Sequence, residues 1–308
     1  MGIRLVALDL DGTLLNSHGE LTARNRAAIA AARLRGVSVV LVTGRRFRDA
    51  RPLALELGLD VPVVAHNGAL TKHARTLETV AVMLLPSETA RAVIRTGRAH
   101  GADALVSDDH EGEGLLVYDH ISEGNTALAK YIAWSRRVVG PGAAASVRRV
   151  PSLEEYLDHD PLHLAFSGGC AAMERLGEVL GEAVGGAVKL LLTLYPKMDF
   201  ALLDVLHPSA SKGAGLAAVA AGQGVERAEV MAVGDNFNDL EMLEYAGTGV
   251  LMGAEDDGEF PPARRARQIR RRHLPPRHQG LHDSGGRPDG HGERRRVGMG
   301  RTLRRRDQ

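Results

Sequence analysis

The apolar residues near the N-terminus fall into short continuous runs that alternate with longer stretches of helical spacing. The runs at 5–8, 37–42 and 61–65 are bounded by Gly or polar residues, a pattern typical of strands buried on both faces of a parallel sheet. Helices are expected between them, from Thr22 to Arg35 and from about Arg46 to Leu57. This β-α-β-α-β order predicts right-handed crossovers, so we expect an α/β fold with a doubly wound parallel sheet.

The pattern changes after the third apolar run. Residues 70–82 alternate loosely, as in a hairpin, and residues 83–205 mix helix-like and strand-like segments without a catalytic motif. We interpret 83–205 as an inserted α+β domain, whereas 1–82 and 206–253 together would form a catalytic core. The later elements are expected to be helices 87–99 and 171–184, an Ala-rich helix that ends at Ala221, and strands 102–107, 115–118, 161–167, 187–195, 198–205, 229–233 and 248–252.

Two carboxylates follow the first strand, in the sequence Asp9-Leu10-Asp11-Gly12-Thr13. Parallel strands present catalytic residues at their carboxyl ends, so this position suits an active site. Carboxylates this close repel each other unless a cation lies between them, and Mg²⁺ is a hard cation that prefers oxygen ligands. Gly12 allows the backbone to turn and leaves its amide open to an anion. The plainer alternative is an Asp-rich turn.

Three more polar clusters lie where the carboxyl edge of the sheet is expected. Thr43-Gly44-Arg45 ends the second strand, Ser211-Lys212-Gly213 begins a helix, and Gly234 to Asp239 ends a later strand as G-D-N-F-N-D. With D-x-D-G-T, these clusters resemble, in order, the four motifs of the haloacid dehalogenase-like (HAD) phosphohydrolases. His66-Asn67-Gly68-Ala69 resembles the S-N-G-A segment of the Cof-type branch, with His in place of Ser. The long insertion resembles the C2-type (IIB) cap of that branch, and the resemblance covers residues 1 to about 253.

This resemblance implies a chemical role for each motif. Asp9 would be the nucleophile that forms an aspartyl-phosphate, and Asp11 would act as general acid and then as general base. Mg²⁺ would be bound by Asp9, by the backbone carbonyl of Asp11 and by Asp235, while Asp239 would act through a water or orient Asp235. The implied phosphate-binding groups are Thr43, Gly44, Lys212, Gly12 and Asn238.

The predicted function is therefore that of a cytoplasmic, Mg²⁺-dependent phosphatase of small phosphorylated metabolites, such as sugar phosphates or cofactor phosphates. Two alternatives stay open at this point. The same site could serve a phosphotransferase or phosphomutase, which returns the phosphoryl group to a sugar. A non-catalytic protein could instead bind anions or nucleic acid through a basic C-terminal tail. Lys212 and Thr43 also have a plainer interpretation, as a solvated helix-start residue and a strand end. The sequence does not identify the substrate, the oligomeric state or the residues that set specificity.

Charge is distributed unevenly along the chain. Residues 1–253 carry 24 basic and 30 acidic side chains, a net of −6, whereas residues 254–308 carry 15 Arg, no Lys and 8 acidic side chains, a net of +7. The last segment is rich in Arg, Gly, Pro and His and has too few apolar residues to bury, so we predict a disordered tail. It is either a genuine basic tail that binds anionic partners or, as we favour, the product of a reading-frame shift near residue 254 in a GC-rich gene.

The remaining composition excludes some classes of protein. Cys170 is the only cysteine, so an internal disulfide is excluded and a reducing compartment fits. Charged residues interrupt every apolar run well short of about 18 residues, so no membrane span is expected. Arg4, Asp9 and Asp11 likewise interrupt the early apolar run, and no signal peptide is predicted.

Overall fold

The protein is described by a computed structural model, which defines residues 2–137, 146–252 and 267–269. All of these belong to one compact unit, residues 1–270. None of the helices within these ranges is long and apolar enough to cross a membrane.

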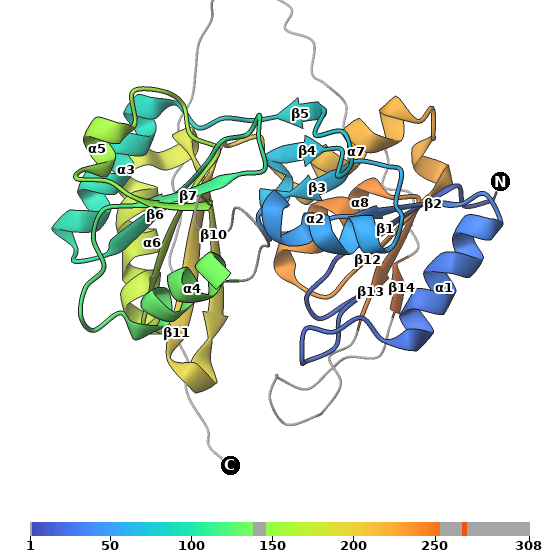
Figure 1. The fold of residues 1–308 in the computed structure, drawn as a ribbon, viewed down its shortest axis with the longest axis horizontal. Helices are drawn as coiled ribbons and strands as arrows, with labels where there is room; N and C mark the ends of the chain where they lie inside the picture. The colour runs from blue at the N-terminus through green and yellow to red at the C-terminus, as the bar shows by residue number, and fades with distance from the viewer. Residues whose placement is uncertain (1, 138–145, 253–266, 270–308) are drawn as a thin grey trace, which may run out of the picture. The chain divides into compact units, whose positions relative to one another are not determined.

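A five-stranded sheet with the order β14-β13-β12-β1-β2 positions the predicted motifs (Figure 1). Its central strand β1 (Leu5–Leu8) pairs in parallel with β12 (Val230–Gly234) on one side and with β2 (Ser38–Leu41) on the other. Beyond β12 follows β13 (Thr248–Leu251), also parallel, and then β14 (Arg267–Ile269), which is antiparallel. The expectation of a parallel α/β sheet is therefore confirmed, with one antiparallel strand added at its edge.

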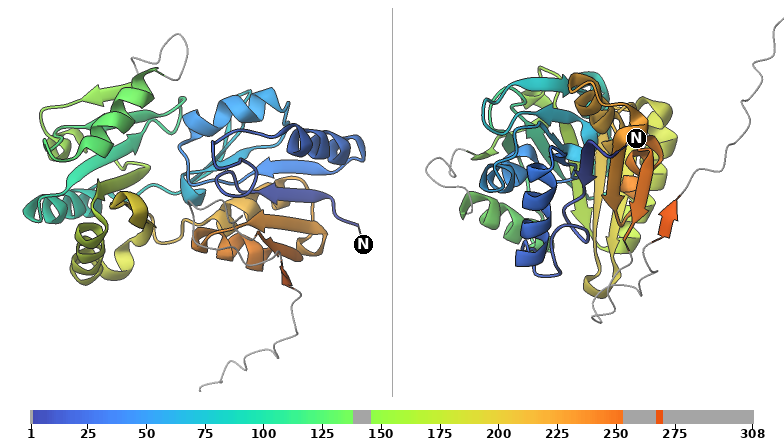
Figure 2. Two further views of the ribbon diagram at one scale, coloured as in Figure 1. Left: turned by 90° about the horizontal axis from the view of Figure 1, so that it is seen from below. Right: turned by 90° about the vertical axis from the view of Figure 1, so that its right-hand side faces the viewer.

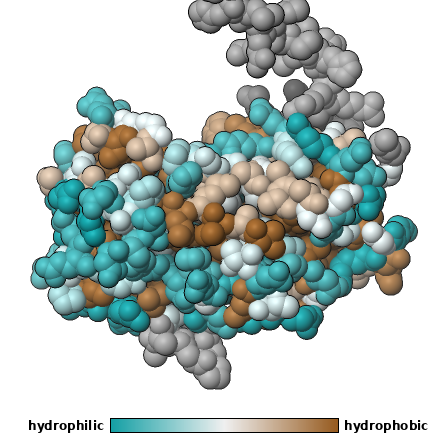
Figure 3. Space-filling view, turned by 90° about the horizontal axis from the view of Figure 1, so that it is seen from above, coloured by the Kyte–Doolittle hydropathy of each residue, from teal (hydrophilic) through white to brown (hydrophobic). Residues whose placement is uncertain are grey.

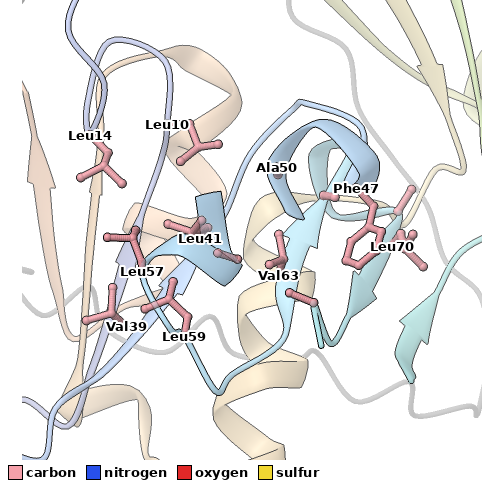
Figure 4. Close-up of a cluster of buried hydrophobic side chains, with 14 of the residues drawn as sticks. Leu10, Leu14, Val39, Leu41, Phe47, Ala50, Leu57, Leu59, Val63 and Leu70 are labelled. Atoms are coloured by element: carbon pink, nitrogen blue, oxygen red, sulfur yellow. The ribbon is translucent and has the colours of Figure 1, made fainter. Parts of the chain in front are cut away.

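Helices cover both faces of this sheet (Figures 1 and 2). Alternate residues of β2 point to opposite sides, so Val39 and Leu41 join one apolar cluster and Val40 joins the other. The first cluster, part of which Figure 4 shows, packs against the helices that follow β1 and β2. Burial of each such side chain contributes about 1.5–3 kcal/mol. The helices are α1 (Ala23–Leu34) and α2 (Phe47–Glu56) on the first side, and α7 (Lys212–Gly222) and α8 (Leu240–Tyr245) on the other.

The third predicted strand runs parallel to the end of β2, as expected, where the Thr43 N–H donates to the Val64 carbonyl at 2.8 Å, and it also joins a separate antiparallel sheet. β3 (Val63–Ala65) forms an antiparallel three-stranded sheet with β4 (Leu70–Lys72) and β5 (Thr79–Val82), and a single parallel bridge from Val42 to Val64 links it to the main sheet. The chain reverses directly after β3 through the 3₁₀ turn η1 (His66–Gly68), so β3 has β4 as its main partner. The predicted 70–82 hairpin is this β4–β5 pair.

A second, six-stranded sheet with the order β10-β11-β9-β6-β7-β8 lies within the predicted inserted segment, apart from its last residue. One of its faces packs against α3 and α6, and α4 covers part of the other face. Helix α4 and strand β8 were not predicted. The strands are β6 (Asp103–Asp108), β7 (Leu115–Tyr118), β8 (Val147–Arg149), β9 (His163–Gly168), β10 (Lys189–Tyr195) and β11 (Phe200–Leu206), and the helices are α3 (Ser87–Ala99), α4 (Thr126–Arg137), α5 (Leu153–Tyr156) and α6 (Cys170–Val184).

The division into a core and a cap stays a proposal, because the two sheets belong to the same compact unit. Apolar side chains from both segments meet, since Leu162 of the inserted segment lies in the cluster that also contains Leu41 and Leu206 of the core. Of the predicted tail, 254–308, only Arg267–Ile269 is described, as β14; the prediction of disorder otherwise concerns residues outside the described ones. The face shown in Figure 3 is largely hydrophilic at its margins, with apolar residues gathered near its middle.

Candidate active site

Three neighbouring strands end at the same edge of the main sheet. Leu8 on β1 is in register with Leu41 on β2 and with Val233 on β12. The residues that follow these positions, Asp9, Thr43 and Asp235, therefore leave the sheet side by side. Sequence position alone had predicted this convergence, and the register of the parallel strands accounts for it.

Lys212 lies at the centre of this edge and joins two of the motifs. It begins α7, and its Nζ donates hydrogen bonds of 2.6 Å to Asp9 Oδ1 and of 2.6 Å to Asp239 Oδ1. All three side chains are buried, and Lys212 is 2% exposed. Burial alone would lower the pKa of Lys212, but the two carboxylates reverse this and raise it. The lysine is therefore a buried cation and not a solvated helix-start residue.

The nucleophile candidate Asp9 is only 4% exposed. Burial raises its pKa to about 7; Lys212 opposes this shift, whereas the neighbouring carboxylates of Asp239 and Asp235 add to it. These carboxylates are thus incompletely neutralised by a single lysine, and they favour a further positive charge at the site.

Asp235 follows β12 and faces the first motif. Its Oδ1 accepts a 2.8 Å hydrogen bond from the Thr13 hydroxyl, and Gly12 (φ +85°) lies so close that a Cβ there would overlap its carboxylate. Burial raises the pKa of Asp235, and Asp239 adds to the shift. Oxygens of Asp9, Asp235 and Asp239 all lie within 4.8 Å of one another. This set of hard oxygen donors fits Mg²⁺.

Asp239 has little capacity left to ligate a metal directly. Its Oδ1 accepts from Lys212, and its Oδ2 accepts 3.0 Å hydrogen bonds from the backbone N–H groups of Asp235 and Asn236. It is also fully buried. This geometry favours the second of its two predicted roles, the orientation of Asp235, over action through a water.

Asp11 lies apart from the three clustered carboxylates. Its side chain is 58% exposed, and the guanidinium of Arg45 binds it in a bidentate manner, with Nε–Oδ2 at 2.8 Å and Nη2–Oδ1 at 2.5 Å. The hydrogen bonds to Asp11 raise the pKa of Arg45. The sequence did not predict the pairing of Arg45 with Asp11. The T-G-R sequence offered the only signal.

The predicted phosphate-binding groups surround a second small network. The Thr43 hydroxyl, almost fully buried, accepts the Arg45 N–H at 3.0 Å. Gly44 lies against the side-chain amide of Asn67, where a Cβ would be 3.0 Å from its oxygen. Asn238 Nδ2 donates a 3.0 Å hydrogen bond to Asn67 Oδ1, so the acidic loop, residues 234–239, is linked to the η1 turn. The structure thus brings the predicted residues to one edge of the sheet.

The chain is similar to known proteins over most of its length. A family model described as haloacid dehalogenase-like hydrolase matches residues 6–258. The putative phosphatase YxeH of Bacillus subtilis is 32% identical over 264 residues, covering 81% of this chain and 87% of that protein. The pyridoxal phosphate phosphatase YbhA of Escherichia coli is 30% identical over 270 residues, covering 83% and 90%. The solved structure of the HAD subclass IIB sugar phosphatase BT4131 matches with a TM-score of 0.65 and 20% identity, covering 82% of this chain and 89% of that chain, which supports the fold.

Proposed function

The chain belongs to the haloacid dehalogenase-like hydrolase family, and from this premise we propose that it is an Mg²⁺-dependent phosphatase of small phosphorylated metabolites. Family membership confirms the predicted enzyme class. The substrate class is supported by the names of its relatives, which include a pyridoxal phosphate phosphatase and several HMP-PP phosphatases. The observation that carries the proposal is the buried lysine that joins Asp9 to Asp239 beside Asp235, at the carboxyl edge of parallel strands.

In the proposed reaction Asp9 attacks the phosphorus atom. Its Oδ1 is fixed by Lys212, and no hydrogen bond occupies its Oδ2 within the described part of the chain, so Oδ2 is free to form the bond to phosphorus. The bond from phosphorus to the leaving oxygen breaks, and Asp11 gives that oxygen a proton. Water then attacks the phosphorus of the aspartyl-phosphate, and Asp11 takes up one proton of that water. The bond from phosphorus to the Asp9 oxygen breaks, which releases inorganic phosphate and regenerates the Asp9 carboxylate.

Asp9 and Asp235 would hold Mg²⁺, together with the backbone carbonyl of Asp11. When bound, the ion would neutralise negative charge on the phosphoryl oxygens. Lys212 adds a fixed positive charge beside the nucleophile, and it reduces the repulsion between Asp9 and an anionic substrate. Thr43, Gly44, Gly12 and Asn238 are proposed to contact the phosphate oxygens. Asp239 is proposed to orient the acidic loop.

Asp9→Asn tests the proposal on the full chain with p-nitrophenyl phosphate and a panel of phosphorylated metabolites, with Mg²⁺ or with EDTA. The amide has the shape of the carboxylate but is a very poor nucleophile, so we expect a loss of about 10⁴-fold or more in kcat. Asp60→Asn, whose side chain is 77% exposed, serves as the control and should retain full turnover. Wild-type turnover by Asp9→Asn would overturn the mechanism. Phosphoryl transfer to an added sugar phosphate would indicate the phosphotransferase alternative.

A further inference from the structure

A chain of polar side chains runs from the acidic loop to the second sheet. Asn238 donates to Asn67 Oδ1, and Asn67 Nδ2 points to Asp204 Oδ2 on β11 at 3.5 Å. His163 on β9 donates from Nε2 to Asp204 Oδ1 at 2.9 Å, since a carboxylate can only accept. The ring of His163 meets that of His66 edge-on, with centroids 5.6 Å apart. We call Asn238, Asn67, Asp204 and His163 the polar relay.

Unsatisfied polar atoms are concentrated in and beside this relay. Within the described ranges, four buried side-chain polar atoms lack a hydrogen-bond partner, and three of them are Asn238 Oδ1, His163 Nδ1 and His66 Nδ1. His66 Nε2 accepts the Phe47 N–H at 3.2 Å, so in the neutral ring its Nδ1 carries the proton. Buried polar groups normally have partners, so such a cluster beside a candidate active site points to a polar ligand.

The carboxylate of Asp204 has spare capacity for that ligand. Its Oδ1 is engaged by His163, whereas the 3.5 Å separation of its Oδ2 from Asn67 makes only a weak hydrogen bond. The side chain is 17% exposed, so it is neither fully solvated nor sealed. A ligand that donates a proper hydrogen bond to Oδ2 would gain more than the weak contact it replaces.

The two acceptor oxygens also lie close to the phosphate-binding groups. Asn238 belongs to the acidic loop, and Asn67 lies against Gly44 beside Thr43. Asn238 and Asp204 both contact the Asn67 amide, since its oxygen accepts from Asn238 Nδ2 at 3.0 Å and its nitrogen lies 3.5 Å from Asp204 Oδ2. A phosphate held at the carboxyl edge would therefore place its leaving group near two acceptors.

We infer that Asp204 and Asn238 determine specificity, and that they select leaving groups which carry at least two hydrogen-bond donors, such as hydroxyls, near the ester oxygen. His163 is the positioning residue that fixes the Asp204 carboxylate. This inference rests on the proposed phosphatase function and deepens it. A site built to accept hydrogen bonds disfavours analogues that lack the donors, because its polar groups then stay unpaired.

The test compares kcat/KM for ribose 5-phosphate and sorbitol 6-phosphate, which carry several hydroxyls, with kcat/KM for p-nitrophenyl phosphate, whose leaving group has no donor. The readout is the ratio of kcat/KM for the hydroxylated esters to kcat/KM for p-nitrophenyl phosphate. In Asp204→Asn the amide oxygen can still accept from His163, so the NH₂ group faces the ligand's donors. We expect the ratio to fall by about 10–100-fold, chiefly through KM of the hydroxylated esters.

Asp158→Asn is the matched control, because Asp158 precedes β9 in the same segment and its side chain is 85% exposed; its ratio should equal that of the wild type. Asp204→Ser, which also removes the charge but has a shorter side chain, should lower the ratio as well. Thermal melting checks that each variant is folded. A folded Asp204→Asn protein with an unchanged ratio overturns this inference alone. A wild-type protein that hydrolyses neither class of ester overturns the proposed function and this inference with it.

Discussion

Lys72 offers a test of how the segment after β6 is attached to the rest of the protein. Its Nζ donates to the backbone carbonyls of His110, Glu111 and Gly112 at 2.7, 2.6 and 2.7 Å. The side chain is fully buried, and its ammonium group lies 5.7 Å from the centroid of the Phe47 ring. Substitution Lys72→Met retains most of the side-chain volume and removes all three hydrogen bonds.

The expected loss follows from these contacts. Each buried carbonyl that loses its partner costs about 1–3 kcal/mol. The 110–112 loop is only partly buried, so water can replace some of the lost bonds. Burial lowers the pKa of Lys72, which shows that placing the ammonium there costs free energy that Met does not incur. After both offsets we expect Lys72→Met to lower the free energy of unfolding by about 2–4 kcal/mol.

Urea denaturation at neutral pH measures this change through the midpoint, provided that the m-value is unchanged. Lys130→Met, on the exposed surface of α4, is the matched control and should change the free energy of unfolding by less than about 0.5 kcal/mol. If Lys72→Met behaves like the control, the three carbonyl contacts do not stabilise the protein and the reasoning is refuted.

Two further predictions concern the site edge. Between pH of about 4 and 7 the metal-free folded protein holds a proton on Asp9 that the unfolded chain has released, so its stability falls as pH rises through this window. Mg²⁺ should therefore raise the melting temperature more at pH 8 than at pH 6, and it should not raise that of Asp235→Ala at all. Equal shifts at both pH values would contradict the assignment. In urea denaturation, Gly68→Ala should lower the free energy of unfolding by at least about 3 kcal/mol more than Gly19→Ala does. Both residues have a positive φ, but only at Gly68 would a Cβ overlap the Ser211 backbone. Equal losses of unfolding free energy in the two variants would contradict this.

The motif-bearing half of the fold was predictable because its signals are local. Short apolar runs identified β1, β2, β12 and β13, and parallel register then brings their carboxyl ends to one edge whatever the rest of the chain does. Lys212 could be placed opposite Asp9 only through the family resemblance, since 203 residues separate them. Physical reasoning from the sequence alone left it as a possible solvated lysine.

The inserted segment was less predictable because its signals are weak. Helix α4 buries only a narrow stripe, in which Leu128 and Ile132 are spaced by one turn, and β8 has three residues. Such elements are stabilised by tertiary packing more than by their own propensities, so their sequences carry little periodic pattern. The strand β3 and its parallel contact with the end of β2 were predicted from its apolar run, but its antiparallel pairing with β4 was not, because that pairing depends on the tight turn at His66–Gly68.

The polar relay shows where sequence reasoning ends. Asn67 meets Asp204 across 137 residues, and His163 meets Asp204 across 41, through the antiparallel register of β9 and β11. A shift of that register by one residue would turn Asp204 to the opposite face of the sheet, among the apolar side chains that pack on α6. His66 is part of the same arrangement: its backbone has a positive φ, its Nε2 accepts the Phe47 N–H, and its ring meets that of His163, while the next residue, Asn67, accepts from Asn238. His66, where the Cof-type segment has Ser, and Asp204 thus belong to one structural feature. The residues that contact the leaving group in our proposal are identified from strand register and unsatisfied polar atoms, not from a sequence motif.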